Sequence, residues 1–191
     1  MSVTPEKFTL DRIQTPIGAM LLAVDSEARL RVLDFEDYEP RMRQLLQRQY
    51  GADVVDLIVG RAPASIRTPI EAYFAGEITA IEAIPVKTPG TTFQREVWAA
   101  LRTIPAGATM SYGALASQIG RPSAVRAVGL ANGANPIGVV VPCHRVIGAD
   151  ASLTGYGGGI ERKRWLLAHE GVEVSAAPSR GRRQVELTFE P

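Results

Sequence analysis

The segment PCHR, residues 142–145, places the only cysteine of the chain beside one of its two histidines. A thiolate is a strong nucleophile, and a nearby imidazole is a common base for generating one. Adjacent side chains diverge by about 100° on a helix and point to opposite faces on a strand, so we expect His144 to reach Cys143 through a water molecule. The alternative is that a lone cysteine behind apolar residues is a small buried hydrophobic side chain.

The residues before Pro142 determine the environment predicted for the thiol. The run IGVVV, residues 137–141, predicts a buried strand, and a turn at Pro142 would place Cys143 at a corner between this strand and a helix. Helix-terminal N–H groups and positive charge near such a corner lower the pKa of a thiol. We therefore expect the pKa of Cys143 to be lowered.

A histidine that acts as a base needs a third group to orient it, and Glu170 in the segment LLAHEG is the candidate. Glu170 lies just before Gly171, at the predicted C-terminus of a helix, where a carboxylate opposes the helix macrodipole. This placement calls for a compensating partner, and we expect that partner to be His144. The alternative is that Glu170 is an ordinary surface charge.

The segment TGYGGGIERKRWLL, residues 154–167, has four glycines ahead of a basic helix. It lacks the Gly-Lys-Ser/Thr of a P-loop, and it fails the G-x-G-x-x-G pattern because Ile160 stands at the sixth position. The loop is therefore either an ordinary turn or a lid. With Tyr156 in it, a lid would close over a planar ligand.

Residues 111–136, SYGALASQIGRPSAVRAVGLANGANP, predict two short helices joined by a turn at Gly120, the second opened by Pro122 and Ser123. This is helix-turn-helix spacing, although such helix pairs also occur as plain packing. The exposed side of the second helix is mostly Ala and Gly around Arg126, whereas a major-groove reader carries several long polar side chains. A smooth helix favours the minor groove, where one guanidinium can enter the base stack.

The elements that must position these residues fall into two halves. In the first half, three β-rich runs between turn signals and two segments of helical spacing lie at residues 8–14, 19–25, 29–36, 39–51 and 66–77. The segment IPVKTPGTT, residues 84–92, has two prolines and a glycine and marks a domain boundary. After it, residues 93–105 predict a helix with Phe93, Val97 and Leu101 on one face.

We therefore expect an α/β (α+β) protein with a small N-terminal α/β scaffold domain, residues 1–88. Residues 89–172 should form a mainly helical domain that carries the helix-turn-helix and the thiol, and residues 173–191 a C-terminal tail. The arginines of the tail either contact phosphates or belong to a disordered segment, and we favour disorder.

Composition narrows the classes of protein. The 191 residues are 46% hydrophobic, which is enough for a normal core. The net charge is +1, but residues 1–89 contain 10 Lys/Arg and 13 Asp/Glu, whereas residues 90–191 contain 11 and 7. The halves therefore carry −3 and +4, which favours a polyanion as a partner of the second half without requiring one.

Cysteine and histidine are too few for a disulfide or a zinc site. A single cysteine excludes an intramolecular disulfide, as is typical of a reducing cytoplasm, and with two histidines it gives no spaced set of zinc ligands. The sequence has neither a signal-peptide core nor an apolar run of about 18 residues. We expect a soluble cytoplasmic protein with no metal and no membrane partner.

Five motifs occur in the order SYGALA, RAVGLANGANP, PCHRV, TGYGGG and LLAHEG. In this the chain resembles the O6-alkylguanine-DNA alkyltransferases, also called methylated-DNA–protein-cysteine methyltransferases. The specific match runs from Phe93 to Gly171, and the N-terminal half fits the family's ribonuclease H-like first domain more loosely. The resemblance implies direct-reversal DNA repair, in which a damaged base is flipped out of double-stranded DNA and its O6-alkyl group moves irreversibly to a cysteine. Each molecule would react once, without a cofactor.

The resemblance assigns roles to the residues around the thiol. Cys143 would be the alkyl acceptor, His144 its water-mediated base, and Glu170 the carboxylate that orients His144. Asn135 would tie the second helix of the helix-turn-helix to the active-site corner. Tyr112 would donate its hydroxyl toward guanine N3 and crowd the backbone phosphate so that the nucleotide rotates out.

Further assignments concern DNA. Arg126 would fill the gap left in the base stack of DNA bound through its minor groove. Two further residues would contact DNA, namely Ala127, beside Arg126 on the smooth face, and Arg121, the only other basic residue of the helix-turn-helix.

The last assignments concern the flipped base. The carbonyls of Cys143 and Val146 would read the exocyclic amine of guanine, and the amide of Gly157 would face O6. Tyr156 would wall the pocket. Asn132 receives no role.

Two other classes of function remain open. A cysteine hydrolase with a Cys-His-Glu triad is the enzymatic alternative, although adjacent Cys and His cannot easily pair directly. A helix-turn-helix regulator without chemistry is the binding alternative, and Cys143 argues against it because binding-only relatives replace this cysteine. The sequence leaves open the size of the alkyl group, O4-alkylthymine repair, regulation and cooperative self-association on DNA.

Overall fold

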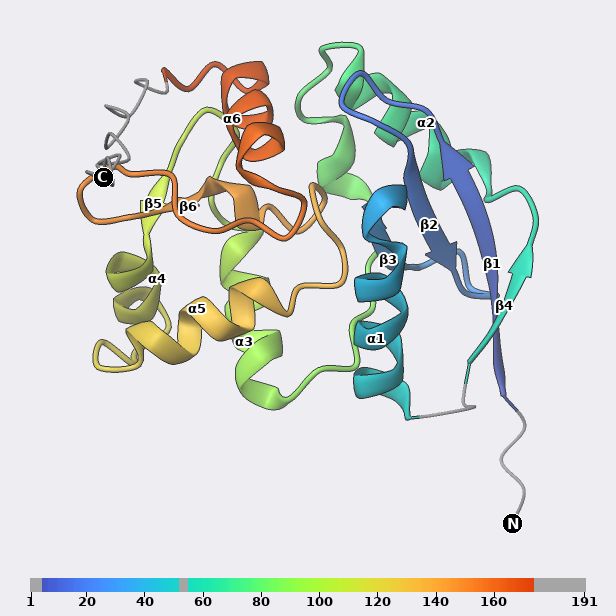
Figure 1. Cartoon of the computed structure of the whole chain (residues 1–191), viewed down its shortest axis with the longest axis horizontal. Helices are drawn as coiled ribbons and strands as arrows, with labels where there is room; N and C mark the ends of the chain where they lie inside the picture. The colour runs from blue at the N-terminus through green and yellow to red at the C-terminus, as the bar shows by residue number, and fades with distance from the viewer. Residues whose placement is uncertain (1–4, 52–54, 174–191) are drawn as a thin grey trace, which may run out of the picture.

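The computed structural model describes residues 5–51 and 55–173, so the predictions for the C-terminal tail lie almost wholly outside the described residues. The elements of the N-terminal half are β1 (Glu6–Ile13), β2 (Met20–Val24), β3 (Leu30–Phe35), η1 (Glu36–Tyr38), α1 (Glu39–Tyr50), β4 (Val55–Val59), α2 (Ala64–Phe74) and η2 (Ala80–Ala83). Those of the C-terminal half are α3 (Thr92–Leu101), β5 (Met110–Ser111), α4 (Tyr112–Gln118), α5 (Val125–Gly133), η3 (Cys143–Arg145), β6 (Val146–Ile147) and α6 (Ile160–His169). Figure 1 shows the sheet on one side of the molecule and most of the C-terminal helices on the other.

The N-terminal half is built on a four-stranded mixed sheet with the order β3-β2-β1-β4. The first three strands form the predicted antiparallel meander, in which Ile13 pairs with Met20 and Met20 with Phe35. The fourth strand, β4, runs parallel to β1 at the edge of the sheet. The expected combination of an α/β half with a mainly helical half is confirmed.

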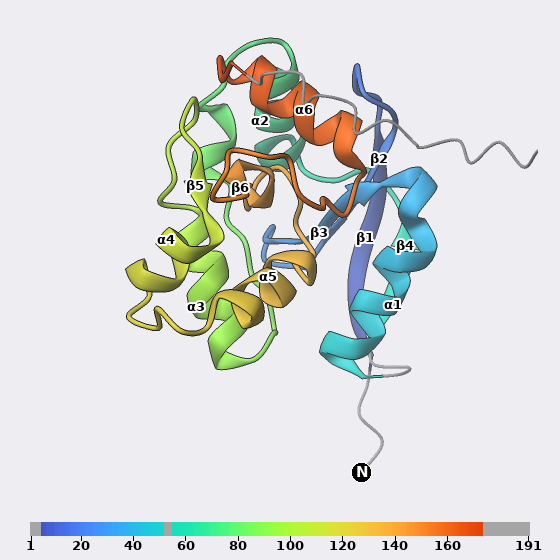
Figure 2. The same cartoon turned by 60° about the vertical axis from the view of Figure 1, so that its left-hand side comes forward.

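Both faces of the sheet are covered, and β2 is buried along its whole length for this reason. Leu21 and Ala23 point to one face and belong to a core with Met42 and Leu46 of α1. Successive strand residues alternate between faces, so Met20, Leu22 and Val24 point the other way. These three join a larger core that includes apolar residues of α2, α3, α4, α5 and α6. A single core thus spans the two halves of the chain, which Figure 2 shows packed against each other.

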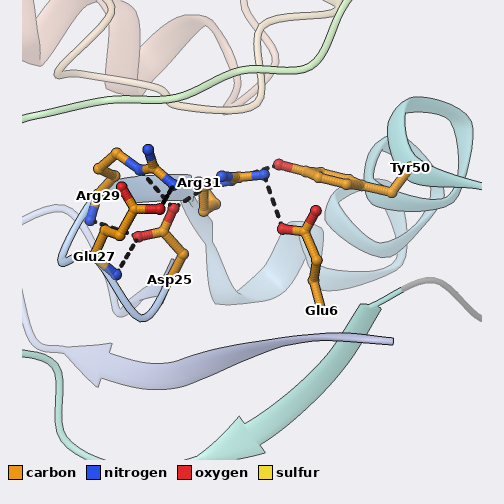
Figure 3. Close-up of polar contacts among 6 residues, drawn as sticks. All are labelled: Glu6, Asp25, Glu27, Arg29, Arg31 and Tyr50. Atoms are coloured by element: carbon orange, nitrogen blue, oxygen red, sulfur yellow. Dashed lines mark hydrogen bonds and ion pairs between the residues drawn. The ribbon is translucent and has the colours of Figure 1, made fainter. Parts of the chain in front are cut away.

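A buried arginine fastens α1 to the sheet on the side away from the C-terminal half. Arg31 of β3 is 2% exposed, and its guanidinium lies 4.8 Å from the ring centre of Phe8 and 5.1 Å from that of Tyr50. It donates to the hydroxyl of Tyr50 at 2.7 Å and to Asp25 at 2.9 Å, with Glu6 at 3.4 Å (Figure 3). Paired charge and flanking rings make burial of this guanidinium tolerable.

The predicted helix-turn-helix is confirmed, with a shift at the start of its second helix. The two helices are α4 and α5, and Gly120 in the turn has the left-handed φ of +71° that glycine adopts readily. Pro122 and Ser123 do not open α5, which begins at Val125. They belong instead to a turn that the amide of Ala124 closes by donating to the carbonyl of Arg121 at 2.9 Å.

One predicted strand is wrong, and one strand of the sheet was missed. The run at residues 137–141 is buried but is not a strand, because only Ile137 forms a bridge, with Leu33, and residues 138–140 turn back at once. Val139 has a left-handed φ of +69°, which a strand excludes. Strand β4 was not predicted. Its apolar residues Ile58 and Val59 are 49% and 85% exposed, so burial does not impose a regular pattern on it.

Candidate active site

The corner that carries the thiol is held by Asn135, which follows α5. Its amide nitrogen donates to the carbonyl of Val141 at 2.8 Å, and its carbonyl oxygen accepts from the amide of Ile137 at 3.0 Å. These bonds close the buried turn from both ends, so the chain reaches Cys143 in a fixed position. The side-chain amide of Asn135 also acts to lower the pKa of Cys143.

The expected lowering of the thiol pKa is wrong. Cys143 is 7% exposed, and burial raises its pKa because the thiolate loses its hydration. The hydrogen bond from Asn135 and the charges of Arg41 and Lys163 act in the opposite direction but do not outweigh burial. Cys143 opens a 3-10 helix of only three residues rather than a long helix, so few aligned N–H groups support the anion. The resting thiol is therefore protonated.

The carboxylate of Glu170 accepts four hydrogen bonds from three side chains. Its Oε1 accepts from Nε2 of His144 at 2.9 Å, from Nη2 of Arg145 at 2.8 Å and from the hydroxyl of Tyr73 at 2.9 Å. Its Oε2 accepts from Nε of Arg145 at 2.8 Å. Burial alone would raise the pKa of Glu170, but the bonds from His144 and Arg145 outweigh burial and lower it to about 2. Glu170 is therefore a buried carboxylate anion, and the surface-charge alternative is excluded.

His144 is placed to take up a proton. Its side chain is fully buried, and burial lowers its pKa although Glu170 opposes this, so the ring is neutral at neutral pH. With Nε2 bonded to the carboxylate, the neutral ring carries its hydrogen there and leaves Nδ1 as an acceptor. Nδ1 is buried and has no hydrogen-bond partner among the described residues. The ring thus offers a free acceptor at the nitrogen away from Glu170.

The short parallel ladder between β5 and β6 brings Tyr112 to the same corner. Tyr112 follows β5 directly and begins α4, while β6 directly follows η3. Tyr112 packs beside Gly129 of α5, where a Cβ would already lie 3.9 Å from its ring, and its hydroxyl accepts from Thr154 at 3.4 Å. Tyr112 therefore lies between the helix-turn-helix and the loop at residues 154–159, which we call the glycine loop.

A cavity of about 310 Å³ opens in front of the thiol. This volume is at the lower end of the range for small-ligand pockets. Cys143 lies in its wall, and Asn132 contributes a buried Oδ1 that has no hydrogen-bond partner among the described residues. The other lining residues are Tyr112, Gly129, Gly133, Gly155, Tyr156 and Gly157. A flat base bounded by two tyrosines and by small residues would suit this cavity.

The glycine loop is packed against the N-terminal half. A Cβ at Gly158 would lie 2.6 Å from the ring of Phe35, and one at Gly157 would overlap the guanidinium of Arg41. Arg41 forms an ion pair of 3.2 Å with Asp34, whose pKa burial raises to about 6. Glycines are therefore required here by the close approach of β3 and α1. Whether the loop also opens as a lid stays a prediction.

The buried Lys163 of α6 connects β6 with the start of the glycine loop. Its Nζ donates to the carbonyl of Val146 at 2.6 Å and to that of Thr154 at 2.8 Å, and burial lowers its pKa to about 8. Val146 is fully buried. The carbonyl predicted to read guanine is thus already bonded once, and only its second lone pair remains for a base.

The residues predicted to contact DNA lie on the surface of the helix-turn-helix. Arg126 and Ala127 are exposed on α5, next to Val125 and Leu130, which are 40% and 74% exposed. This face is apolar apart from Arg126, but Val125 and Leu130 make it bulkier than the surface of Ala and Gly that was predicted. Arg121 is exposed too, but its guanidinium pairs with Glu96 of α3 at 3.0 Å.

Sequence reasoning missed the roles of Arg145, Tyr73, Lys163 and the pair Asp34–Arg41 in building the site. Arg145 adjoins His144 in the sequence, so the motif itself carries a signal for it. No local pattern marks Tyr73, because its contact with Glu170 joins residues 97 positions apart.

Among the described residues, no three His, Cys, Asp or Glu side chains are grouped to bind a metal ion. None of the described helices is long and apolar enough to span a bilayer.

Two sequence families match the chain. Residues 11–88 match the family described as 6-O-methylguanine DNA methyltransferase, ribonuclease-like domain. Residues 92–172 match 6-O-methylguanine DNA methyltransferase, DNA binding domain. The two matches together cover most of the chain.

Individual relatives agree with the family matches. The methylated-DNA–protein-cysteine methyltransferase of Shigella flexneri is 50% identical over 161 residues, covering 84% of this chain and 94% of that protein. The protein of the same name from Mycolicibacterium paratuberculosis is 49% identical over 160 residues, covering 83% and 89%. Among solved structures, OGT of Mycobacterium tuberculosis in complex with DNA is similar with a TM-score of 0.71 and 44% identity, covering 86% and 92%.

Proposed function

The chain belongs to the 6-O-methylguanine DNA methyltransferase family, and we propose on this premise that it repairs DNA by moving an alkyl group from O6 of guanine to its own Cys143. It is a methylated-DNA–protein-cysteine S-methyltransferase that acts by direct reversal of the damage. The observation that carries the proposal is a free thiol in the wall of a cavity of about 310 Å³, with a neutral imidazole and a carboxylate anion behind it. A hydrolase would need the same groups, but the family is one of alkyl transfer.

Proton transfer comes first. The thiol of Cys143 gives its proton through one water molecule to Nδ1 of His144, the acceptor that has no partner among the described residues. The imidazolium is stabilised by Glu170, which remains ionised because its pKa is about 2. Burial that raises the pKa of the thiol also leaves the thiolate poorly solvated, which makes it a reactive nucleophile.

Alkyl transfer follows. The thiolate attacks the carbon bonded to O6, so a sulfur–carbon bond forms, the carbon–oxygen bond breaks, and the electron pair stays on guanine. Tyr112, in the cavity wall, donates from its hydroxyl to N3 and stabilises the leaving base. One proton leaves the thiol and one is taken up by guanine, giving S-alkylcysteine and neutral guanine. A thioether is not hydrolysed under mild conditions, so each molecule reacts once.

Access to the base requires double-stranded DNA to be opened. The O6 atom lies inside the duplex, so the nucleotide must rotate out, at a cost of a few kcal/mol that is smaller for a damaged pair. The apolar face of α5 lies in the minor groove, with Arg126 in the gap left in the stack and Ala127 against the groove. Arg121 contacts phosphate after leaving Glu96.

We assign the base contacts to the cavity. The amide of Gly157 faces O6, Tyr156 covers the flat face of guanine, and the carbonyls of Cys143 and Val146 accept from its exocyclic amine. Asn135 fixes the corner that carries the thiol.

The wider assignments are proposals as well. Residues 1–88 form a ribonuclease H-like domain and residues 89–172 the DNA-binding and alkyl-acceptor domain, with residues 173–191 as a tail. A cytoplasmic location is supported by the free cysteine, which must stay reduced to react. The reaction itself consumes only the thiol and the alkylated base, so it needs no cofactor.

Transfer of label from DNA to protein tests the function. A duplex containing O6-methylguanine with a radiolabelled methyl group is incubated with the wild type and with Cys143→Ser. The label on the protein is then located by peptide mapping. We expect label on Cys143 in the wild type and none in the variant, which keeps DNA affinity within a few-fold because serine has the same shape. Label released as methanol would indicate a hydrolase, and binding without loss of label from DNA would indicate a regulator.

A further inference from the structure

Tyr73, near the C-terminal end of α2, brings the N-terminal half into direct contact with the active-site carboxylate. Its side chain is fully buried, and its hydroxyl donates to Oε1 of Glu170 at 2.9 Å. Helices α2 and α6 lie at the same end of the molecule in both views (Figures 1 and 2). The tyrosine comes from the half that was expected to be a scaffold, and the function described above does not use it.

The position of the Tyr73 hydroxyl is fixed by aromatic packing. The Tyr73 ring meets Phe74 and His169 edge-on, with ring centres 5.1 and 5.2 Å apart. His169 in turn stacks on Trp165 at 4.5 Å, and its Nε2 bonds the backbone carbonyl of Tyr73 at 2.7 Å. Backbone and ring are therefore both anchored to α6, which carries Glu170 at its C-terminal end. The hydroxyl has little freedom to turn away from the carboxylate.

The hydroxyl competes with His144 for one oxygen atom. Oε1 of Glu170 accepts from His144, Arg145 and Tyr73, whereas Oε2 accepts from Arg145 alone. A carboxylate oxygen offers about two lone-pair directions, so three donors must share its charge. Burial and the adjacent carboxylate raise the pKa of Tyr73, which keeps the hydroxyl a donor at every working pH. Each donor therefore weakens the bonds made by the other two.

We propose that Tyr73 is a positioning residue that limits the basicity of His144 by sharing Oε1 of Glu170 with it. The inference rests on the proposed function in one respect, which is that His144 is the proton acceptor for Cys143. A carboxylate that bonded His144 without competition would hold the imidazolium more tightly. Tyr73 thus adds to the effect of burial, which keeps the resting ring neutral and able to accept the proton.

The substitution Tyr73→Phe does not change the other charged and titratable groups around His144. Glu170 and Lys163 face it from α6 and its C-terminal end, and Cys143 and Arg145 flank it in η3. The ring of Tyr156, from the glycine loop, meets it edge-on with centres 6.4 Å apart. A change in the pKa of His144 in a Tyr73→Phe variant would therefore report on the missing donor.

The test compares two Tyr→Phe variants of the N-terminal half. Tyr73→Phe removes the donor to Glu170, and Tyr50→Phe removes the hydroxyl that accepts from Arg31 at 2.7 Å in the network of Figure 3. The single-turnover rate of methyl transfer from a saturating duplex is measured between about pH 5 and 9, and the ring nitrogens of His144 are followed by NMR over the same range.

In Tyr73→Phe we expect the acidic limb of the rate profile and the midpoint of His144 protonation to move up by about half a pH unit or more. Tyr50→Phe should leave both at the wild-type values. Replacement of Tyr73 by 3-fluorotyrosine, a stronger donor of nearly the same size, should move the acidic limb and the His144 midpoint to lower pH. This replacement provides the test if the phenylalanine variant does not fold.

Unchanged midpoints in all three variants would overturn the proposal and leave Tyr73 a packing residue. The NMR titration needs no alkyl transfer. A wild type that transfers no methyl group would therefore refute the proposed function while the shared-oxygen proposal is still decided by the spectra.

Discussion

Glu170 is the residue on which the most contacts of the site converge, and its removal should be felt in both folding and reaction. Glu170→Gln leaves Arg145 as a buried charge with only a neutral partner, which costs about 3 kcal/mol of unfolding free energy. The imidazolium also loses its counter-ion, so the transfer rate should fall at least about tenfold. Denaturant unfolding and single-turnover kinetics measure the two effects. Glu161→Gln, on the exposed start of α6, is the control and should change stability by less than about 0.5 kcal/mol.

The same pair of proteins gives a pH dependence with a defined sign. The pKa of Glu170 is about 2 in the folded state and near 4.5 in the unfolded chain, so its ionised form stabilises the fold above pH 4.5. This contribution is lost as pH falls from 4.5 toward 2. We expect the stability gap between the wild type and Glu170→Gln to be constant near neutrality and to narrow through that window. A gap that stays constant down to pH 2 would show that Glu170 is not held as an anion.

The sequence could predict the reactive residues but not all of their surroundings. Cys143, His144 and Glu170 stand in distinctive motifs, and the structure brings all three to one corner. The direction of the thiol pKa was wrong because burial depends on segments far along the chain, including the loop and β3. Tyr73 was missed for the same reason, since nothing in its own helix marks it as a partner of Glu170.

At the scale of elements, α5 gives a prediction that separates binding of DNA from chemistry. Arg126→Ala should lower the transfer rate on duplex DNA much more than on free O6-benzylguanine, because a free base needs no extrusion and leaves no gap to fill. Arg61→Ala removes the same charge from an exposed position outside the helix-turn-helix and should leave both rates near wild type. Equal losses on the two substrates in Arg126→Ala would make that residue structural.

The glycine loop gives a second prediction at this scale. Gly158→Ala places a Cβ 2.6 Å from the ring of Phe35, which is 1% exposed and cannot move aside, so overpacking should cost about 1–3 kcal/mol. The displaced loop should also slow transfer from the free base. Gly155→Ala is the control for stability, since no described atom lies within 4 Å of its added Cβ. Gly155 lines the cavity, so the free-base kinetics of Gly158→Ala are compared with those of the wild type instead. Thermal unfolding of the two variants decides whether close packing explains the glycine at position 158.

Elements with a clear hydrophobic periodicity or with strong turn and stop residues were predictable from the sequence. Elements whose shape depends on tertiary contacts were not. The meander, α1 with its stop at Gly51 and the helix-turn-helix all follow from local signals. The apolar run at residues 137–141 has the composition of a strand, but Asn135 bonds both of its ends and holds it as a turn. The apolar composition of this run predicted its burial correctly, but it could not predict the conformation of the backbone.

At the scale of the whole molecule, one core joins the two halves, and the site lies where they meet. Phe35, Arg41 and Tyr73 reach the loop, the thiol or the carboxylate from the N-terminal half. The sequence predicted two domains with the chemistry confined to the second. The structure assigns the first half a share in building the site, because residues that hold the glycine loop and Glu170 come from it. The domain boundaries themselves stay a prediction.

The central claim is that the protein consumes one thiol for each alkyl group removed, and titration with excess substrate tests it most directly. The wild type is incubated with a large molar excess of duplex containing O6-methylguanine, and repaired guanine and intact protein mass are measured together. We predict that repair stops at one equivalent per protein and that the protein gains the mass of one methyl group, located on Cys143. Repair that continues past one equivalent, or protein of unchanged mass after repair, would contradict the account.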